Sequence, residues 1–542
     1  MSSVTTARGK SGAMTSEQRM VIFASSLGTV FEWYDFYIYG TLGVFLAKYF
    51  FANVPANVGF IFALLAFAAG FAVRPFGALI FGRLGDLIGR KYTFLITMSL
   101  MGVGTFFIGL LPGYATLGIM APILLIAFRL IQGLALGGEY GGAAIYVAEH
   151  APADKGVSSP SWFQTTATLG LFMALLLILG IRTVMGEQAF GEWGWRLPFL
   201  LSAVLLIVSI WIRLRLNESP LFQKMVAEGK ASKRPLSEAF GEWKNAKIAL
   251  AALFGATAGE AVIWYGGQFY ALFFLTQTLK VPAVTAQILI VIALALGTPF
   301  FIFFGWLSDK IGRKPIMMAG FALGALTYFS IFQGLTHFAN PAVERGPSAP
   351  RGHFAADPNE CSFQFKATGT EKFTTGCDNI KSTLVNLSVN YTNVEAPKGT
   401  KASVKIGDQV IPSDTQNLAA AIGTPVKTHG YPAAADVNQI NYPMTILLLT
   451  ILVIYVTMVY GPIAAWLVEL FPTRIRYSGL SLPYHIGNGW FGGFLPATVF
   501  AIVAATGNIY SGLWYPIIIA CMSFVVALIF LPETKDRDIT RM

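Results

Sequence analysis

GRLGDLIGRK, residues 82–91, is matched later in the chain by GWLSDKIGRK, residues 305–314. Both stretches read G-x-x-x-D-x-x-G-R-K, and each follows the second long apolar segment of its part of the chain. A motif that returns at an equivalent place indicates an internal duplication, which is common in membrane proteins whose two halves rock against each other. The chain is therefore expected to consist of two related halves.

The composition excludes an ordinary soluble protein. Of the 542 residues, 55% are hydrophobic and 12% are charged, whereas soluble domains carry ~25% charged residues. Apolar segments of about 20 residues suit a hydrocarbon core ~30 Å thick, and about twelve such segments are present. The predicted spans are residues 20–47, 58–83, 92–112, 116–148, 161–184, 195–215, 247–278, 283–308, 314–338, 443–468, 478–505 and 511–531.

The distribution of Lys and Arg predicts the orientation of the chain. The repeated stretches, the linker at 213–247, PTRIR and the final KDRDITR are basic and fall on one side, whereas the loops 48–57, 112–115 and 185–194 carry only Lys48. Because cytoplasmic loops collect basic residues, we expect a multi-pass protein of the bacterial inner (plasma) membrane with both termini in the cytoplasm. The bias also accounts for the net charge of +10, so no nucleic-acid partner is expected.

The chain divides into seven predicted parts. In order they are a polar cytoplasmic tail (1–19), a six-helix half (20–215), a cytoplasmic linker (216–246), helices seven to nine (247–338), a polar insertion (340–442), helices ten to twelve (443–531) and a second cytoplasmic tail (532–542).

The insertion at 340–442 falls on the periplasmic side. FQFKAT, STLVNLSVNYTNVEA and ASVKIGDQVI alternate apolar with polar residues, which predicts strands in a small β-rich domain. Cys361 and Cys377 lie in this insertion and are expected to form a disulfide in an oxidising compartment; two free thiols are the alternative.

Each matched residue of the repeated loop has an expected structural role. In each copy, one glycine lets helices approach closely, an aspartate pairs with a helix N-terminus or a basic group, a second glycine permits a tight turn, and an arginine reaches across the loop as a forked donor. Basic loops alone would explain the Lys and Arg but not the matched Gly and Asp. The residues concerned are Gly82, Asp86, Gly89 and Arg90, and Gly305, Asp309, Gly312 and Arg313.

FEWYDFYIYG, residues 31–40, places Glu32 and Asp35 inside the first predicted span. A charge at the centre of such a helix costs ~2.5–3.5 kcal/mol on insertion scales, and the three-residue spacing puts both carboxylates on one helical face. Arg74 and Arg129 are the strongly basic residues expected to be buried in the same half. A carboxylate that gains and loses an Arg neighbour changes its proton affinity, which would couple protons to movement; the alternative is a static buried ion pair.

Other polar and aromatic residues inside the spans are candidates for contact with a small solute. Glu139 could instead serve close helix packing, Trp and Tyr are also common interfacial anchors, and a buried His is often only hydrogen-bonded. The candidates are Tyr34, Tyr37, Arg74, Glu139, Gln164, Glu260, Trp264, Tyr265, Gln268, Tyr484, His485 and Asn488.

FEWYDFYIYG, VRPFGALIFGRLGD, RLIQGLALGGEYGGAAIYVAEHAP, GWRLPF and ELFPTRIRYSG resemble the metabolite:proton symporter branch of the major facilitator superfamily, which includes carriers of proline/betaine, 2-oxoglutarate, shikimate and citrate. The repeated loop is that superfamily's most specific motif, and the likeness covers nearly the whole chain except the tails and 340–442. It implies an all-α polytopic fold of about twelve helices in two pseudo-symmetric six-helix halves, here with a β-rich insertion.

The resemblance also implies roles for single residues. Asp35 is the expected proton acceptor and Arg129 its partner, with Glu32 as second choice. Four acids at helix ends are expected to pair with the loop arginines when the carrier opens outward: Glu149 and Glu218 with Arg90, and Glu469 and Glu533 with Arg313.

The expected function is proton-coupled uptake of a small organic acid by alternating access. A betaine- or proline-type osmolyte carrier is the alternative within transport, and a receptor of the same fold without net transport is the alternative outside it. No H-E-x-x-H or G-x-x-x-x-G-K-[ST] motif is present and there are five His, so neither an enzyme, a metal site nor a cofactor is expected. The expected partners are the solute, the proton and the bilayer, and the protein is expected to be monomeric.

Overall fold

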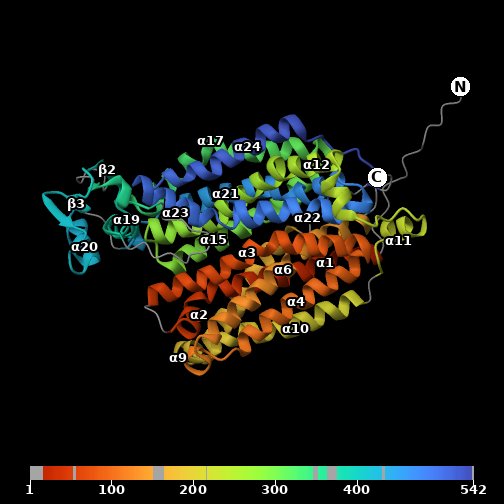
Figure 1. Cartoon of the computed structure of the whole chain (residues 1–542), viewed down its shortest axis with the longest axis horizontal. Coiled ribbons are helices and arrows are strands. Elements are labelled where there is room, and N and C mark those ends of the chain that lie inside the picture. The colour runs from red at the N-terminus through yellow and green to blue at the C-terminus, as the bar shows by residue number, and fades with distance from the viewer. Residues whose placement is uncertain are drawn as a thin grey trace.

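The computed structural model describes residues 16–52, 56–150, 164–214, 217–345, 352–362, 375–429 and 434–539. Its helices gather into two bundles that lie side by side along the length of the molecule, with a small separate domain at one end (Figure 1). We call the bundle from α1 to α10 the first bundle and the bundle from α12 to α24 the second bundle. The end that carries the two repeated loops is called the loop end, and it lies opposite the small domain.

The first bundle contains the long helices that follow from the apolar segments before the linker. Its helices are α1 (Ser16–Thr41), α2 (Gly43–Phe50), α3 (Ala56–Leu87), α4 (Arg90–Leu110), α5 (Tyr114–Leu117), α6 (Met120–His150), α8 (Thr166–Met185), α9 (Glu187–Glu192), η1 (Gly194–Arg196) and α10 (Leu197–Leu214). At the loop end, α11 (Pro220–Ala227) and η2 (Ser237–Gly241) follow in the linker.

The second bundle begins with one continuous helical stretch from Trp243 to Thr278, which we call the seventh helical stretch and which changes repeatedly between α- and π-helical turns. Such π-helical turns are frequently found at functional sites. The stretch is α12 (Trp243–Ala252), η3 (Leu253–Thr257), α13 (Ala258–Tyr265), η4 (Gly266–Tyr270), α14 (Ala271–Phe273) and η5 (Phe274–Thr278). The other elements are α15 (Ala283–Gly297), α16 (Pro299–Ile311), α17 (Arg313–Ala339), α18 (Pro341–Arg345), α21 (Tyr442–Leu470), η9 (Thr473–Ile475), α22 (Arg476–Ile486), η10 (Gly487–Gly492), α23 (Leu495–Thr506), η11 (Ser511–Leu513) and α24 (Trp514–Phe530).

Many helices are long and apolar enough to cross a bilayer. Within the described ranges, nine have the length and hydropathy of a membrane span, and α8 adds a shorter apolar segment. Large apolar side chains such as Leu326, Ile207 and Phe530 are 78%, 67% and 66% exposed, which suits contact with lipid rather than water. The number of twelve spans stays a prediction.

The small domain is built from β1 (Gly352–Ala356), η7 (Pro358–Glu360), α19 (Gly376–Asn386), β2 (Tyr391–Glu395), β3 (Ser403–Ile406), β4 (Gln409–Pro412), α20 (Leu418–Thr428) and η8 (Val437–Gln439). The sheet has the order β2-β1-β3-β4, in which β1 pairs parallel to β2 and antiparallel to β3, and β3 pairs antiparallel to β4. Its side chains form a hydrophobic core separate from that of the bundles.

The alternating pattern in STLVN was wrong as a strand prediction, because these residues belong to α19. Thr375 caps the helix by accepting a hydrogen bond from the Asp378 N–H at 3.1 Å, and Ile380 and Leu384 share the buried helical face. FQFKAT lies outside the described residues. A disulfide joins Cys361 to Cys377, the pair expected from the sequence.

The small domain is fastened to the second bundle by main-chain contacts. Tyr391 donates its N–H to the Gly507 carbonyl at 3.0 Å and its hydroxyl to the Ala504 carbonyl. Lys280 donates from Nζ to the Asn386 carbonyl at 2.6 Å, and partial burial at this contact lowers the pKa of its ammonium group. These contacts tie the domain to the ends of the seventh helical stretch and of α23.

Candidate functional site

The first copy of the repeated loop turns sharply between α3 and α4. Gly89 has φ = +115°, a conformation that only glycine adopts without strain. Arg90 then folds back, donating from Nη1 to the Gly85 carbonyl at 2.6 Å and pairing with Asp86 at 3.1 Å. Its Nη2 crosses to the second bundle and donates to the Thr473 carbonyl at 2.7 Å.

Asp86 also crosses between the bundles. It is fully buried, and its carboxylate oxygens accept the N–H groups of Tyr477 at 3.2 Å and Ser478 at 2.8 Å, in the first turn of α22. A carboxylate at a helix N-terminus satisfies unpaired N–H groups and the helix dipole together. The contact is close because Gly85 has no side chain: a methyl group there would lie 1.8 Å from the Tyr477 ring.

Glu149, at the end of α6, makes a further link between the bundles. Its Oε1 accepts from Arg476 Nη1 at 2.7 Å, and its Oε2 lies 3.7 Å from Arg90 Nε, all with side chains 0% exposed. Ser219 donates its hydroxyl to the same carboxylate. The Arg476 contact was missed from the sequence, although FPTRIRYSG had been recognised as a motif, because the loop arginines alone were expected to pair.

The second copy of the loop repeats this local geometry within the second bundle. Gly312 has φ = +114°, and Arg313 donates from Nη2 to Glu469 Oε1 at 2.9 Å and lies 3.3 Å from Asp309 Oδ1. Thr534 donates its hydroxyl to Glu469 Oε2 at 2.5 Å, as Ser219 does to Glu149. Residues 151–163, between α6 and α8, lie outside the described residues.

Glu218 and Glu533 correct the expected pairing with the loop arginines. Glu218 accepts the main-chain N–H groups of Arg90 and Lys91, each at 3.1 Å. Glu533 accepts those of Arg313 and Lys314 at 3.1 and 3.0 Å. Each glutamate therefore caps the N-terminus of the helix that begins at the loop, and it does so from a distant part of the chain.

The matched dipeptides Glu218-Ser219 and Glu533-Thr534 repeat the same arrangement in each bundle. The glutamate caps the helix, while the hydroxyl that follows bonds to a buried glutamate. Their similarity in the sequence was the signal that could have revealed it.

Inside the first bundle, Asp35 and Arg129 are joined through two further side chains. Thr105 donates to Asp35 Oδ2 at 2.7 Å, Gln132 donates to Thr105 at 2.6 Å, and Arg129 donates to Gln132 Oε1 at 2.7 Å. The Arg129 guanidinium also lies 4.2 Å from the centre of the Tyr39 ring. All four members of the chain are buried. The Glu32 side chain lies outside the described part of the structure.

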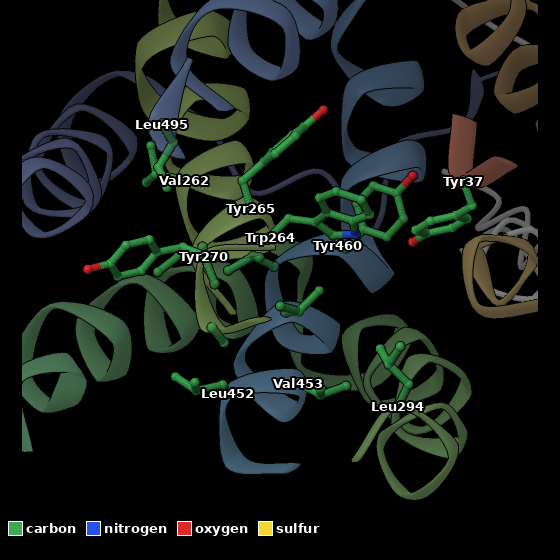
Figure 2. Close-up of a cluster of buried hydrophobic side chains, with 14 of the residues drawn as sticks. Tyr37, Val262, Trp264, Tyr265, Tyr270, Leu294, Leu452, Val453, Tyr460 and Leu495 are labelled. Atoms are coloured by element: carbon green, nitrogen blue, oxygen red, sulfur yellow. The ribbon is translucent and has the colours of Figure 1, made fainter. Parts of the chain in front are cut away.

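An aromatic cluster fills the region where the bundles meet. Trp264 lies 4.9 Å from Trp33 between ring centres and 6.3 Å from Tyr460, and Tyr37 stacks on Phe269 at 6.0 Å. Figure 2 shows Tyr37 of the first bundle facing Trp264 and Tyr460 of the second. The described residues include no hydrogen-bond partner for the Trp264 Nε1–H.

Nearer the loop end, a stack of tyrosines spans the two bundles. Tyr140 stacks on Tyr484 with ring centres 3.7 Å apart, and Tyr484 lies 3.4 Å from Tyr460 between hydroxyl oxygens. Gln164 donates to the Tyr140 hydroxyl at 2.8 Å. Glu139, the residue before Tyr140 on α6, is fully buried.

The remaining candidates divide between this region and other contacts. Tyr34 donates to the Pro198 carbonyl at 2.7 Å, which places its hydroxyl in packing against α10. Arg74 acts electrostatically on His485, and the described residues offer no partner to the Arg74 Nε or to either His485 ring nitrogen. Tyr265 and Gln268 are buried.

The last two candidates, Glu260 and Asn488, are hydrogen-bonded to each other at 2.9 Å. Among the described side chains no group of three or more His, Cys, Asp or Glu is placed to hold a metal ion.

Comparison with known proteins points to one family. The family model described as "Sugar (and other) transporter" matches residues 20–253 and 419–542. The proline/betaine transporter of Salmonella typhimurium is 37% identical over 320 residues, which cover 57% of this chain and 63% of that protein, less than two thirds of its length. The shikimate transporter of Escherichia coli is 35% identical over 326 residues, 59% of this chain and 73% of that protein.

A solved structure shares the fold over nearly the whole chain. It is the major facilitator superfamily proton:xylose symporter XylE bound to 6-bromo-6-deoxy-D-glucose, with a TM-score of 0.62 at 16% identity, covering 97% of this chain and 98% of that one.

Proposed function

The chain belongs to the sugar (and other) transporter family of the major facilitator superfamily, and on that premise we propose that it is a proton-coupled symporter of a small carboxylate-bearing metabolite. The observation that carries the proposal is the pair of links at the loop end, Asp86 to the start of α22 and Glu149 to Arg476. They hold the two bundles together at one end, and they are few and polar enough to break and re-form.

The orientation follows from the basic loops. With the loop end in the cytoplasm, as the positive-inside rule predicts, these links close the solute path on the cytoplasmic side. Opening that side requires Asp86 to leave the helix N-terminus and Glu149 to leave Arg476. Such buried charges need partners in either conformation, so the exchange between two arrangements is expected to be all-or-none rather than gradual.

Proton coupling is assigned to the chain from Asp35 to Arg129. A buried carboxylate near an arginine is ionised when the positive charge is close and takes up a proton when it is not. Because Thr105 and Gln132 stand between the two, a small helix movement is enough to connect or disconnect them.

The test is uptake into proteoliposomes with an acidic exterior, with radiolabelled shikimate and glycine betaine as probes. We expect Asp35→Asn to abolish accumulation against a gradient while leaving exchange of solute across the membrane. Glu192→Gln, an exposed carboxylate on α9, is the matched control and should behave as the unaltered protein. Accumulation by Asp35→Asn equal to that of the unaltered protein would exclude Asp35 as the coupling residue.

An organic acid is the first candidate solute. Arg74 and His485 supply a buried basic pair between the bundles, and the Arg74 Nε is without a partner among the described residues. A guanidinium binds a carboxylate through two parallel hydrogen bonds. Arg74→Lys is therefore expected to raise the KM for shikimate more than it lowers the maximal rate.

A zwitterionic osmolyte is the second candidate, favoured by the aromatic cluster. Aromatic faces attract quaternary ammonium groups, and Trp33 and Tyr460 both lie against Trp264 where the bundles meet. Thermal stabilisation of the purified protein by glycine betaine but not by shikimate would select this candidate. Binding of either solute without any uptake would instead favour a receptor.

A further inference from the structure

Glu260 lies at the centre of the seventh helical stretch, on α13 between the π-helical turns η3 and η4. Its side chain is 0% exposed, and its Oε2 accepts from Asn488 Nδ2, on η10, at 2.9 Å. The helices approach closely here, because a methyl group at Gly487 would lie 2.6 Å from the Thr257 hydroxyl oxygen. The other oxygen, Oε1, is buried with no hydrogen-bond partner among the described residues.

The helices packed against α13 bring no positive charge to this carboxyl group. The sequences of η10, α23 and α24, like those of η3 and η4, contain no Asp, Glu, Lys, Arg or His. On α21 the one charged residue is Glu469, which pairs with Arg313 of α17 at the loop end. α17 carries two other charged or titratable residues, Lys314 and His337. Lys314 donates to the Leu528 and Leu531 carbonyls, and His337 pairs with Glu344.

The remaining neighbours are tyrosines and one histidine. Tyr328 donates its hydroxyl to the Ile263 carbonyl at 3.3 Å, and the phenol of Tyr484 lies near enough to interact electrostatically with Glu260. On α22, Arg476 forms an ion pair with Glu149, and His485 interacts electrostatically with Arg74. Within the described residues, Glu260 therefore has a single neutral amide as its donor.

A buried carboxylate with one neutral donor and no cation is unstable compared with the uncharged acid. The Asn488 amide can donate to either form, so it does not require the charge. The carboxyl group of Glu260 is thus protonated in this conformation, and the proton is shielded from water on all sides.

A cation that could later take the place of this proton lies across the interface. Arg74 of α3 lies beside η10, since a methyl group at Gly489, the residue after Asn488, would lie 3.8 Å from the Arg74 Cβ. Arg74 belongs to the first bundle and Glu260 to the second, so rocking the bundles changes the distance between them. Asp35 and Arg129, by contrast, both belong to the first bundle.

We propose that Glu260 is a second proton-carrying group of the transport cycle, which holds its proton in the present conformation and releases it when rocking brings Arg74 toward it. The proton enters from the periplasmic water, is carried on a carboxyl oxygen of Glu260, and leaves to the cytoplasmic water as the carboxylate pairs with the guanidinium. The inference rests on the proposed function, since it adds a second coupled proton to the one assigned to Asp35.

The first test does not depend on a transported solute. Infrared spectra of the full-length protein at neutral pH are expected to show the C=O stretch of a buried, protonated carboxylic acid, shifted in D₂O. Glu260→Gln should lose this band, whereas the exposed Glu187→Gln on α9 should keep it. A protonated band of equal intensity in Glu260→Gln would overturn the proposal.

The second test measures how steeply solute accumulation depends on the pH gradient, with radiolabelled shikimate or glycine betaine in proteoliposomes. Two coupled protons give about tenfold more accumulation than one for each unit of pH difference. We expect Glu260→Gln to lose that factor of about ten and Glu260→Asp, which keeps a titratable group, to retain it. Thermal unfolding checks that both variants fold.

The outcomes separate the two proposals. An unchanged dependence in Glu260→Gln, together with loss of accumulation in Asp35→Asn, would overturn the role of Glu260 and leave symport intact. If the unaltered protein accumulates neither probe under a pH gradient, the infrared band alone decides whether Glu260 carries a proton.

Discussion

The two copies of the repeated loop have nearly the same sequence and the same local structure, yet their described contacts lead to different places. In both, a glycine with φ near +115° ends one helix and a distant glutamate caps the next. From the first copy, Asp86 and Arg90 reach across to the second bundle. From the second copy, Arg313 bonds to Glu469 and Ser308 of its own bundle.

Burial of the two aspartates follows the same division. The side chain of Asp86 is 0% exposed, while that of Asp309 is 26% exposed. Hydrogen bonds of a buried charge stabilise more than those of an exposed one, because water competes less. The duplicated motif thus gives the same turn between two helices in both copies. The helix that packs against each turn determines whether the motif also links the two bundles.

The largest difference between matched variants is expected for Glu149 and Glu469, the two buried glutamates that accept hydrogen bonds from arginines. Breaking a buried ion pair by removing one charge costs ~3–5 kcal/mol. In Glu149→Gln this cost falls on the contact between bundles, so the loop end should open. In Glu469→Gln it falls within the second bundle, so the free energy of unfolding should decrease while the loop end stays closed.

Measured distances between two spin labels can separate these outcomes. Spin labels on Tyr92→Cys and Ile311→Cys, which are exposed positions of the two bundles, report the separation across the loop end in a Cys521→Ala background. A longer distance is expected in Glu149→Gln only. Equal opening in Glu469→Gln would mean that the second copy also fastens the bundles.

The next largest difference is expected between variants of the two loop aspartates, Asp86 and Asp309, in the equilibrium for opening the loop end. Asp86→Asn removes the charge that two N–H groups of α22 share, and a hydrogen bond to a charged group contributes ~1.5–3 kcal/mol. Asp309→Asn alters a partly exposed pair that contributes ~0–1 kcal/mol. The opening equilibrium is therefore expected to change by about 10- to 100-fold in Asp86→Asn and by less than about fivefold in Asp309→Asn.

Alkylation of a cysteine that the contacts between the bundles bury at the loop end measures this equilibrium. Ser481 is buried on α22, and a methyl group at Gly141 of the first bundle would lie 2.2 Å from its hydroxyl oxygen. In Ser481→Cys with Cys521→Ala, the rate of reaction with N-ethylmaleimide should rise with opening. Similar rates in the two aspartate variants would remove the distinction between the loops.

The smallest difference is expected between the two capping glutamates. Glu218 and Glu533 accept the same two N–H groups at nearly equal distances, and loss of a helix cap costs ~0.5–2 kcal/mol. Glu218→Ala and Glu533→Ala should therefore lower the midpoint of thermal unfolding by similar amounts, about 2–4 °C for a bundle of this size. Tryptophan fluorescence on heating gives the midpoints, and a clearly larger effect of one variant would contradict the equivalence of the caps.

Much of this arrangement could be read from residues close together in the sequence. The spacing from Asp86 to Arg90 places both on one turn, and the glycine before the arginine indicates the reversal of the chain. The same spacing from Asp309 to Arg313 predicts the second loop. The long apolar segments predict the spans, and the wrong strand in STLVN arose because a pattern of five residues fits a strand and a helix almost equally well.

The contacts between distant segments could not be read in the same way. Nothing near Glu218 in the sequence shows that its oxygens meet the N–H groups of Arg90 and Lys91, because main-chain donors carry no sequence signature. Likewise, Asp35 and Arg129 were recognised as partners, but Thr105, which links Asp35 to Gln132 beside Arg129 on α6, comes from α4 and was not found.

Local sequence was therefore enough to define the helices, the paired turns and the acidic residues inside the membrane, since these depend on hydropathy and on neighbours within a few positions. Which carboxylate bonds across the interface, which caps a helix and which is left with a lone amide depended on how the helices pack. Packing brings together groups separated by hundreds of residues, and the charge of each buried group is set by those neighbours rather than by its own segment.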